Sequence, residues 1–327
     1  MKNVILLADP KSNAWSFASK MKDYIFQVKN VNVPLEEVRV DTFSNGEIDL
    51  HVPHNIRRRE VYFIHDSTKN PQQWVQEIRL ATNLLLLSSV ERINYVFPDM
   101  KYNRQDRKHK PRVPISAVDL AVFLKQFWPV TREVFTMDLH AKQIEGFYYP
   151  LPVENIPSTP TLAGFLKSEK GISNLEDIVL VAADKGDADR VEDLTNYLKL
   201  KNPPAFIYKQ RNVQTRKIDH MELIGNVKNK KVLVPDDIID KGTTLCGAAE
   251  LLRSEGAKEI ACYATHGWFS KGEEIITNCF DKVIVSNTHN KQYGKGIEVM
   301  DVSSIFAEAI YRSQVGESIS ELWSKSF

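Results

Sequence analysis

A run of apolar residues that ends in two adjacent carboxylates constrains the fold of this chain more than any other feature. Residues 231–234 have the pattern of a buried strand, Asp236 and Asp237 follow it closely, and a short loop then leads to an apolar-periodic helix. A strand, a loop and a helix in this order are typical of α/β proteins. Gly242 in the loop allows the backbone to approach an oxyanion or to take a positive φ.

The start of this helix is suited to bind a phosphate. The first N–H groups of a helix have no intrahelical partners, and the helix dipole adds partial positive charge there. A phosphate can lie against residues 241–244, where Thr243 and Thr244 either cap the helix or donate their hydroxyls. Two acids beside such a cradle suit hydroxyl donors or a cation, so the stretch indicates a phosphorylated sugar. The alternative is an ordinary strand-to-helix turn with a solvated acidic pair.

Strand and helix patterns alternate along the chain, which predicts an α/β fold with mainly parallel sheets. A length of 327 residues is enough for two domains of ordinary size. Four prolines between residues 150 and 160 mark the expected boundary, so we place one domain at 1–155 and the other at 156–327. The turn at 44–46 predicts a β-hairpin, and the segment 209–226 predicts a flap.

Composition excludes several classes of protein. The 43 Lys and Arg nearly balance the 42 Asp and Glu, so no overall charge would recruit nucleic acid or an anionic membrane. No apolar run approaches a membrane span or a signal peptide, which makes a cytoplasmic enzyme the expectation. Cys246, Cys262 and Cys279 are too few and too scattered to predict a disulfide framework or a zinc site. Cys246 is predicted to be a small buried thiol.

A basic stretch stands out in this otherwise near-neutral chain. Seven of the fourteen residues at 101–114 are Lys, Arg or His, and the stretch follows a predicted strand at 93–97. Open α/β sheets bind ligands at the carboxyl ends of their strands. Arg104, Arg107 and Arg112 can therefore clamp a polyphosphate. The alternative is a solvated loop, which is the commoner role of a basic run.

Asp138 and His140 lie two residues apart at the end of the next predicted strand. Residues at this spacing face the same side of a strand, so both can point into one site. On these two residues alone, a structural histidine and a metal or phosphate ligand both stay open.

Taken in order, these segments resemble the ribose-phosphate diphosphokinase (PRPP synthetase) family along nearly the whole chain. The resemblance is carried by residues 43–47, 104–108, 110–115, 138–141, 143–147, 236–244, 264–267 and 316–320. Each stretch alone is weak, whereas the ordered set is specific. The resemblance implies two tandem phosphoribosyltransferase-like domains, each a mainly parallel sheet flanked by helices.

The reaction that the resemblance implies is transfer of the β,γ-diphosphoryl group of MgATP to the 1-hydroxyl of ribose 5-phosphate. The products are PRPP and AMP, and PRPP feeds nucleotide biosynthesis. Mg²⁺ is the implied cofactor, and ATP and ribose 5-phosphate are the implied ligands. The resemblance also implies a homo-oligomer built on a dimer, with dimer and hexamer both open, and no nucleic-acid or membrane partner.

Site residues follow from the resemblance position by position. The ribose 5-phosphate site would consist of Asp236, Asp237, Asp240, Lys241, Gly242, Thr243 and Thr244. The ATP site would consist of Phe43, Asn45, Glu47, Arg104, Gln105 and His140. The metal ligands would be His140 and Asp184, and the catalytic residues that neutralise the transferring group would be Lys209 and Arg211.

Four positions differ from the residues usual in the family, namely Asn45, Lys241, Thr243 and Asp187. They motivate a second hypothesis, in which the chain is a non-catalytic homologue that binds nucleotide or regulates a true synthetase. A third hypothesis is a phosphoribosyltransferase that consumes PRPP. The ATP-binding segments of the amino-terminal half speak against the third.

Overall fold

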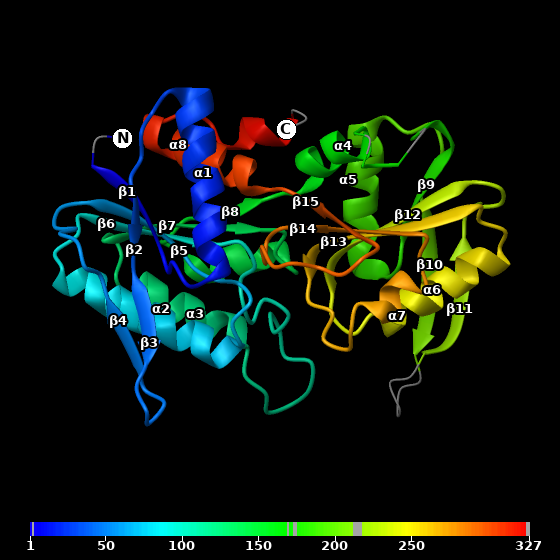
Figure 1. The fold of residues 1–327 in the computed structure, drawn as a ribbon. Coiled ribbons are helices and arrows are strands. Elements are labelled where there is room, and N and C mark those ends of the chain that lie inside the picture. The colour runs from blue at the N-terminus through cyan, green and yellow to red at the C-terminus, as the bar shows by residue number, and fades with distance from the viewer. Residues whose placement is uncertain (2, 169, 173–174, 212–217, 325–327) are drawn as a thin grey trace. The chain divides into compact units, whose positions relative to one another are not determined.

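Figure 1 shows a computed structural model of the chain, which describes residues 1–327 except 2, 169, 173–174, 212–217 and 325–327. At 185, 210–211, 218–219 and 323–324 it describes the backbone alone. The chain divides into two compact units. Unit 1 comprises Met1–Pro157, Thr288–Lys291 and Val302–Glu321, and unit 2 comprises Ser158–Asn287, Gln292–Asp301 and Leu322–Phe327. Each unit is built on a mainly parallel sheet, as predicted.

Unit 1 contains, in its described residues, a six-stranded parallel sheet with the order β2-β1-β5-β6-β7-β8. Its strands are β1 (Val4–Ala8), β2 (Leu35–Glu37), β5 (Glu60–Ile64), β6 (Arg92–Phe97), β7 (Thr131–Met137) and β8 (Val153–Ile156). The predicted hairpin forms a separate antiparallel pair, β3 (Arg39–Thr42) and β4 (Ile48–His51). All residues of β1 are buried, because helices cover both faces of a parallel sheet.

Helices cover the unit 1 sheet on both faces (Figure 1). They are α1 (Asn13–Lys29) and α8 (Ser303–Val315) on one face, and α2 (Pro71–Leu87) and α3 (Ser116–Lys125) on the other, with a 3₁₀ helix at Lys142–Tyr148. Trp74 and Ile78 of α2 are fully buried against the sheet in one continuous apolar cluster. Helix α2 begins at Pro71 because the side chain of Asn70 accepts a hydrogen bond from the Gln73 N–H and caps it.

Unit 2 contains, within the described ranges, a seven-stranded sheet with the order β11-β10-β9-β12-β13-β14-β15. The strands are β9 (Ile178–Ala182), β10 (Ala205–Arg211), β11 (Ile218–Ile224), β12 (Lys231–Ile239), β13 (Glu259–Gly267), β14 (Lys282–Ser286) and β15 (Ile297–Met300). Only β10 and β11 pair antiparallel among these strands. Helices α4 (Thr159–Leu166) and α5 (Ala188–Leu198) lie on one face, and α6 (Thr243–Ser254) and α7 (Glu274–Thr277) on the other (Figure 1). Three 3₁₀ helices complete the described chain, at Leu175–Asp177, Lys185–Asp187 and Ser320–Ser324.

The structure adds local elements that the sequence did not indicate. Strands β2 and β8 have three and four residues, too few for a clear alternating pattern. The predicted flap begins as a hairpin of β10 and β11, and residues 212–217 of the flap lie outside the described residues. None of the described helices is long and apolar enough to cross a membrane.

The prediction for two of the cysteines was wrong. Cys246 and Cys279 form a disulfide across 33 residues of chain, with their Cα atoms 5.4 Å apart. Cys262 is a free, buried thiol. The error has a physical reason, because the distance between two cysteines in space is set by the packing of α6 and α7 and leaves no local sequence pattern.

Candidate active site

The acidic end of β12 meets the loop after β9 at one edge of the unit 2 sheet. Strand β12 pairs in parallel with β9 and β13, so the carboxyl ends of these strands lie together. The strand is longer than predicted and includes both Asp236 and Asp237 before it ends at Ile239. Ligand sites of open α/β sheets lie at such an edge.

Three carboxylates form a tight group at this edge. Asp187, Asp236 and Asp237 each offer an oxygen, and these atoms all lie within 4.8 Å of one another. Burial raises the pKa of Asp236 well above its usual range, and the Asp187 carboxylate raises it further. The pKa of Asp187 is raised to about 7, first by burial and then by Asp184. The group therefore gathers more negative charge than it can easily hold ionised, which suits a divalent cation or sugar hydroxyls.

The predicted phosphate cradle is the loop between β12 and α6. Gly242 is the N-cap residue of α6 with a φ of 77°, and it provides no side chain to cap the helix. A Cβ at this position would lie 2.5 Å from the Ile276 side chain. Glycine is thus required both by the left-handed backbone and by the close packing of α7. Because no side chain of Gly242 caps the helix, the N–H groups at the start of α6 are suited to bind an anion.

Contacts from the segment after β13 anchor this loop. The Ser270 hydroxyl donates a hydrogen bond to Asp240 Oδ1 at 2.6 Å, and the Ser270 N–H donates to the Asp240 carbonyl at 2.9 Å. Lys241 and Thr243 are exposed, and Thr244 is half-buried. The structure therefore brings the seven predicted ribose 5-phosphate residues into one strand end and loop.

The predicted catalytic residues lie on β10, which forms with β11 the antiparallel hairpin at one side of this sheet. Lys209 pairs with Met221 of β11, and its ammonium is close enough to Asp187 to lower the pKa of that carboxyl. Arg211 is the last residue of β10, and its side chain lies outside the described residues. Asp184, a predicted metal ligand, is exposed beside the acidic group and accepts a hydrogen bond from the Gly186 N–H at 2.8 Å.

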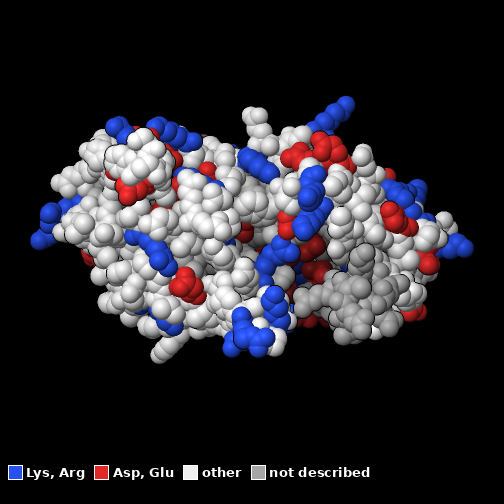
Figure 2. Space-filling model, turned by 90° about the horizontal axis from the view of Figure 1, so that it is seen from below, with Lys and Arg blue, Asp and Glu red and all other residues white. Residues whose placement is uncertain are grey.

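The predicted ATP residues of unit 1 lie on two neighbouring strand ends and on the hairpin. The basic loop follows β6 and His140 follows β7, and these strands pair in parallel. Arg104 and His140 are exposed, and Gln105 accepts a hydrogen bond from the Ser116 hydroxyl at 2.6 Å. Figure 2 shows Lys and Arg side chains gathered locally among Asp and Glu on the face seen from below. This pattern agrees with a local rather than a global basic field.

The hairpin of β3 and β4 presents the other three predicted ATP residues at its turn. Phe43 is 55% exposed. Asn45 donates through Nδ2 to Glu47 Oε2 at 2.9 Å, and the Glu47 N–H donates back to Asn45 Oδ1 at 3.1 Å. These two bonds hold the turn in shape, so Asn45 has a structural role in the hairpin.

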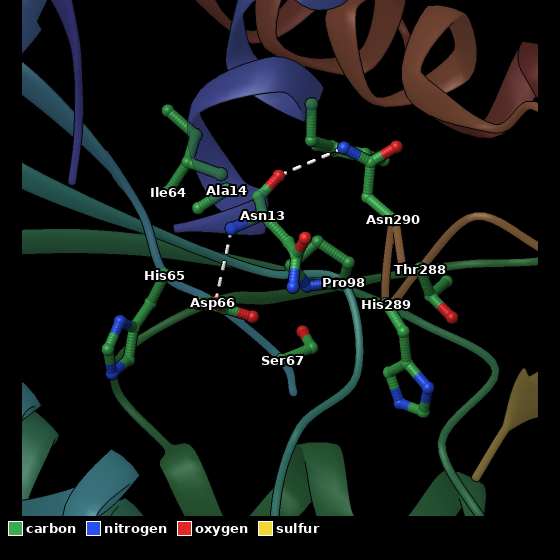
Figure 3. A pocket seen from close by; sticks show the side chains of 11 residues that line it. Asn13, Ala14, Ile64, His65, Asp66, Ser67, Pro98, Thr288, His289 and Asn290 are labelled. Carbon is green, nitrogen blue, oxygen red and sulfur yellow. Dashed lines mark hydrogen bonds between the residues drawn. The ribbon is translucent and has the colours of Figure 1, made fainter. Parts of the chain in front are cut away.

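Unit 1 has its own pocket at the equivalent edge of its sheet, where α1 begins and β5 ends (Figure 3). There Asp66 accepts hydrogen bonds from the Asn13 N–H at 3.2 Å and from the Thr68 N–H at 2.8 Å. Asn290 donates to the Asn13 carbonyl at 2.9 Å. A carboxylate of the protein itself thus occupies the N-terminus of α1, the position that an anionic ligand would take.

Asp187 is the site residue that sequence reasoning missed. It is one of the four positions that differ from the residues usual in the family, and the sequence predicted no role for it. An acid three residues after Asp184 was the available signal. Only the pairing of β9 with β12 shows that Asp187 joins Asp236 and Asp237.

Two family models match the chain. Residues 14–127 match a family model described as the N-terminal domain of ribose phosphate pyrophosphokinase. Residues 177–324 match a model described as a phosphoribosyl synthetase-associated domain.

Two relatives extend the similarity to nearly the whole chain. A ribose-phosphate pyrophosphokinase from Aquifex aeolicus is 36% identical over 294 residues, which cover 88% of this chain and 91% of the relative. The crystal structure of phosphoribosylpyrophosphate synthetase from Mycobacterium smegmatis superimposes with a TM-score of 0.81 at 29% identity. That match covers 96% of this chain and 99% of the other.

Proposed function

This chain belongs to the ribose-phosphate pyrophosphokinase family, and we propose that it transfers the β,γ-diphosphoryl group of ATP to the 1-hydroxyl of ribose 5-phosphate. The products are PRPP, a precursor in nucleotide biosynthesis, and AMP. The observation that carries the proposal is the juxtaposition, on one strand end, of a phosphate-binding helix N-terminus and an acidic group. Together these two features match the two ends of a phosphorylated sugar.

In unit 2, the loop residues 240–244 bind the 5-phosphate through the N–H groups at the start of α6. Asp236 and Asp237 accept hydrogen bonds from the ribose hydroxyls, which fixes the sugar for attack on the β-phosphorus. Lys209 and Arg211 neutralise charge on the transferring group. Support for Lys209 comes from its position near Asp187 at the same edge of the sheet.

ATP is bound by Arg104, Gln105 and His140 of unit 1, and Phe43, Asn45 and Glu47 of the hairpin complete a nucleotide site. Arginine suits this role because its planar guanidinium binds phosphate oxygens in a bidentate way. The exposure of Arg104 and His140 leaves both accessible to a ligand.

Mg²⁺ is the proposed metal. In unit 2 the family resemblance implies Asp184 as a ligand, and the group of Asp187, Asp236 and Asp237 offers three carboxylate oxygens of the kind that Mg²⁺ prefers. In unit 1 the resemblance implies His140 as a ligand. The raised pKa values of Asp187 and Asp236 support a cation there, because a positive charge would favour their ionised forms. A bound Mg²⁺ would supply positive charge that offsets the charge developing on the transferring group.

We also expect a cytoplasmic homo-oligomer built on a dimer. The exposed Phe43 at the tip of the hairpin supports an intersubunit contact, because a large apolar side chain gains most when a partner buries it. Light scattering coupled to size-exclusion chromatography measures the assembly. A monomer at micromolar concentration would contradict this expectation.

The direct test is formation of AMP and PRPP by the purified protein with MgATP and ribose 5-phosphate. Each substrate is omitted in turn, and EDTA replaces Mg²⁺ in a further sample. Both products should appear only when both substrates and the metal are present. Nucleotide binding without turnover would instead favour the regulatory homologue, and consumption of PRPP with a nucleobase would favour a phosphoribosyltransferase.

A further inference from the structure

The disulfide joins α6, the helix that begins at the phosphate loop, to the residues just after α7, the short helix that packs against α6. Cys246 lies in the first turns of α6, four residues after Gly242, and Cys279 follows α7 by two residues. The Cys246 N–H donates a hydrogen bond to the Gly242 carbonyl at 2.9 Å. The covalent link therefore enters the fold one helical turn from the loop that contains the phosphate cradle.

Helix α7 forms the wall against which that loop is packed. A Cβ at Gly242 would lie 2.5 Å and 2.7 Å from two atoms of the Ile276 side chain, which is 1% exposed. The position of Ile276 thus limits where the loop backbone can lie. Any change that lets α7 move away gives residues 240–244 more conformational freedom, and this freedom is lost again when a phosphate binds.

Apolar packing also holds α7 in place, because Ile275 packs against the apolar cluster of unit 2 and Phe280, just after the helix, is buried in that cluster. The helix has four residues, Glu274–Thr277, and Ile276 is its buried member. Arg253 of α6 donates to the Cys279 carbonyl and to Asp281, both at 3.1 Å, but these groups are partly exposed and such pairs contribute little. The disulfide therefore adds a covalent restraint to the apolar packing that holds α7 against α6.

The surroundings of the disulfide also suit the reduced state. The two sulfur atoms lie 3.2 Å and 3.0 Å from the Ile275 carbonyl oxygen, so either thiol can donate an S–H to it after reduction. Cys279 is partly exposed, whereas Cys246 is 9% exposed. A reducing thiolate is therefore expected to attack the sulfur of Cys279.

We infer that the Cys246–Cys279 pair is a thiol-redox modification site that sets the affinity of the 240–244 loop for ribose 5-phosphate. This inference rests on the proposed function of that loop. A dithiol reductant breaks the S–S bond through a mixed disulfide, both sulfurs become thiols, and the reductant leaves as its own disulfide with two electrons and two protons transferred. Disulfides of proteins in reducing compartments are mostly transient and regulatory, which fits this role.

The oxidised protein binds ribose 5-phosphate more tightly, because the tether holds α7 against Gly242 and keeps the loop ready for the phosphate. Coupling between two sites is typically of the order of tenfold, and it is reciprocal. Saturating ribose 5-phosphate should therefore shift the equilibrium between disulfide and dithiol by the same factor. For a two-electron couple, a tenfold shift corresponds to about 30 mV.

Calorimetric titration of the full chain with ribose 5-phosphate, before and after reduction by a dithiol, tests the inference. Reduction should raise the Kd for ribose 5-phosphate roughly tenfold and leave the Kd for ATP within about twofold. The double variant C246S/C279S should behave like the reduced protein with or without reductant. The matched control is C262S, which removes the buried free thiol and should keep the full response to reductant.

A second measurement needs no variant. The oxidised fraction of the wild-type protein is titrated against mixtures of a dithiol and its disulfide, and the free thiols are alkylated and counted by mass spectrometry. Ribose 5-phosphate should move the midpoint toward the dithiol-rich mixtures. Equal ribose 5-phosphate affinity in both redox forms overturns the coupling and leaves the proposed function intact. No ribose 5-phosphate binding by either form overturns the assignment of the loop, and the inference with it.

Discussion

The two units share one strand order but differ in the surroundings of the acids at their strand ends. In unit 1 the strand order β2-β1-β5-β6-β7-β8 corresponds to β10-β9-β12-β13-β14-β15 in unit 2. The loops after β1 and β5 are therefore the counterparts of the loops after β9 and β12. Both pairs of loops place carboxylates at the carboxyl end of a parallel sheet, where ligands bind.

In unit 1 these acids are used within the protein. Asp66 accepts hydrogen bonds from the start of α1 and from Thr68, and Asp9 accepts one from the Lys11 N–H at 3.0 Å. Lys69 Nζ lies 2.7 Å from Oε1 of the buried Glu77 and 4.0 Å from Asp9 Oδ2. Acids with such partners stabilise the fold.

In unit 2 the equivalent acids face one another. The carboxylates of Asp187, Asp236 and Asp237 converge within 4.8 Å, and burial together with mutual repulsion raises the pKa of Asp187 and of Asp236. Such crowding lowers the stability of the protein, and a ligand that brings positive charge or hydrogen-bond donors to these carboxylates relieves it. At the same strand ends, acids are thus bonded to the neighbouring backbone and to Thr68 in unit 1 and are crowded against one another in unit 2.

The largest effect is expected when one acid of unit 2 is removed, because only the unit 2 acids are proposed to bind the substrate. Asp237→Asn should lower kcat/KM for ribose 5-phosphate about a hundredfold to a thousandfold, because a charged acceptor for a sugar hydroxyl is lost. Steady-state kinetics of PRPP formation measures the effect. Asp66→Asn in unit 1 is the matched control and should keep kcat/KM within about threefold. Equal losses in both variants would mean that the two edges do not differ in function.

The second prediction concerns one lysine in each unit, the half-buried Lys209 and the buried Lys101. Lys209→Ala should lower kcat about a hundredfold with a KM for ATP changed less than about threefold, because its charge is needed mainly in the transition state. Lys101 of unit 1 donates to Asp99 at 3.0 Å and to the Ser67 carbonyl, so Lys101→Met should act through stability. Unchanged turnover in Lys209→Ala would remove this residue from the mechanism.

The third prediction uses the pH dependence of stability. The folded pKa of Asp187, about 7, lies above its unfolded value, so the native state binds more protons between these values. Stability from this group is complete at low pH and is lost as the pH rises from about 4 to about 7. At pH 8 without metal, Asp187→Asn should therefore be more stable than the wild type by roughly 2 kcal/mol, with no such gain at pH 4.

Urea unfolding of both proteins in EDTA at the two pH values measures this difference. Excess Mg²⁺ at pH 8 should reduce it, because a bound cation stabilises the ionised carboxylates of the wild type. A gain that is equal at both pH values would show that Asp187 acts through packing and not through its charge.

The smallest expected effect is structural and lies in unit 1. Asp66 accepts hydrogen bonds on both carboxylate oxygens, from Asn13 on one side and Thr68 on the other. An asparagine has a single acceptor oxygen, so Asp66→Asn should cost about 1 kcal/mol of stability. Thermal unfolding measures it, and a variant as stable as the wild type would show that Asp66 does not cap α1.

Much of this organisation follows from local sequence. The apolar runs and the periodic patterns predicted the main strands and helices, because each pattern depends on residues within one element. The loop before α6 was also predicted, and Gly242 takes a positive φ there, which is one of the two roles expected for this glycine. The strands β2 and β8 are too short to leave such a pattern.

Contacts between distant segments were decided by tertiary structure. Asp187 joins Asp236 across 49 residues only because β9 pairs with β12. Cys246 reaches Cys279 because α7 packs on α6, and Asp66 caps α1 because β1 pairs with β5. The sequence by itself determined which elements form and which carry acids. The packing of those elements decided which acids find partners, because charge and burial depend on neighbours in space and not on neighbours along the chain.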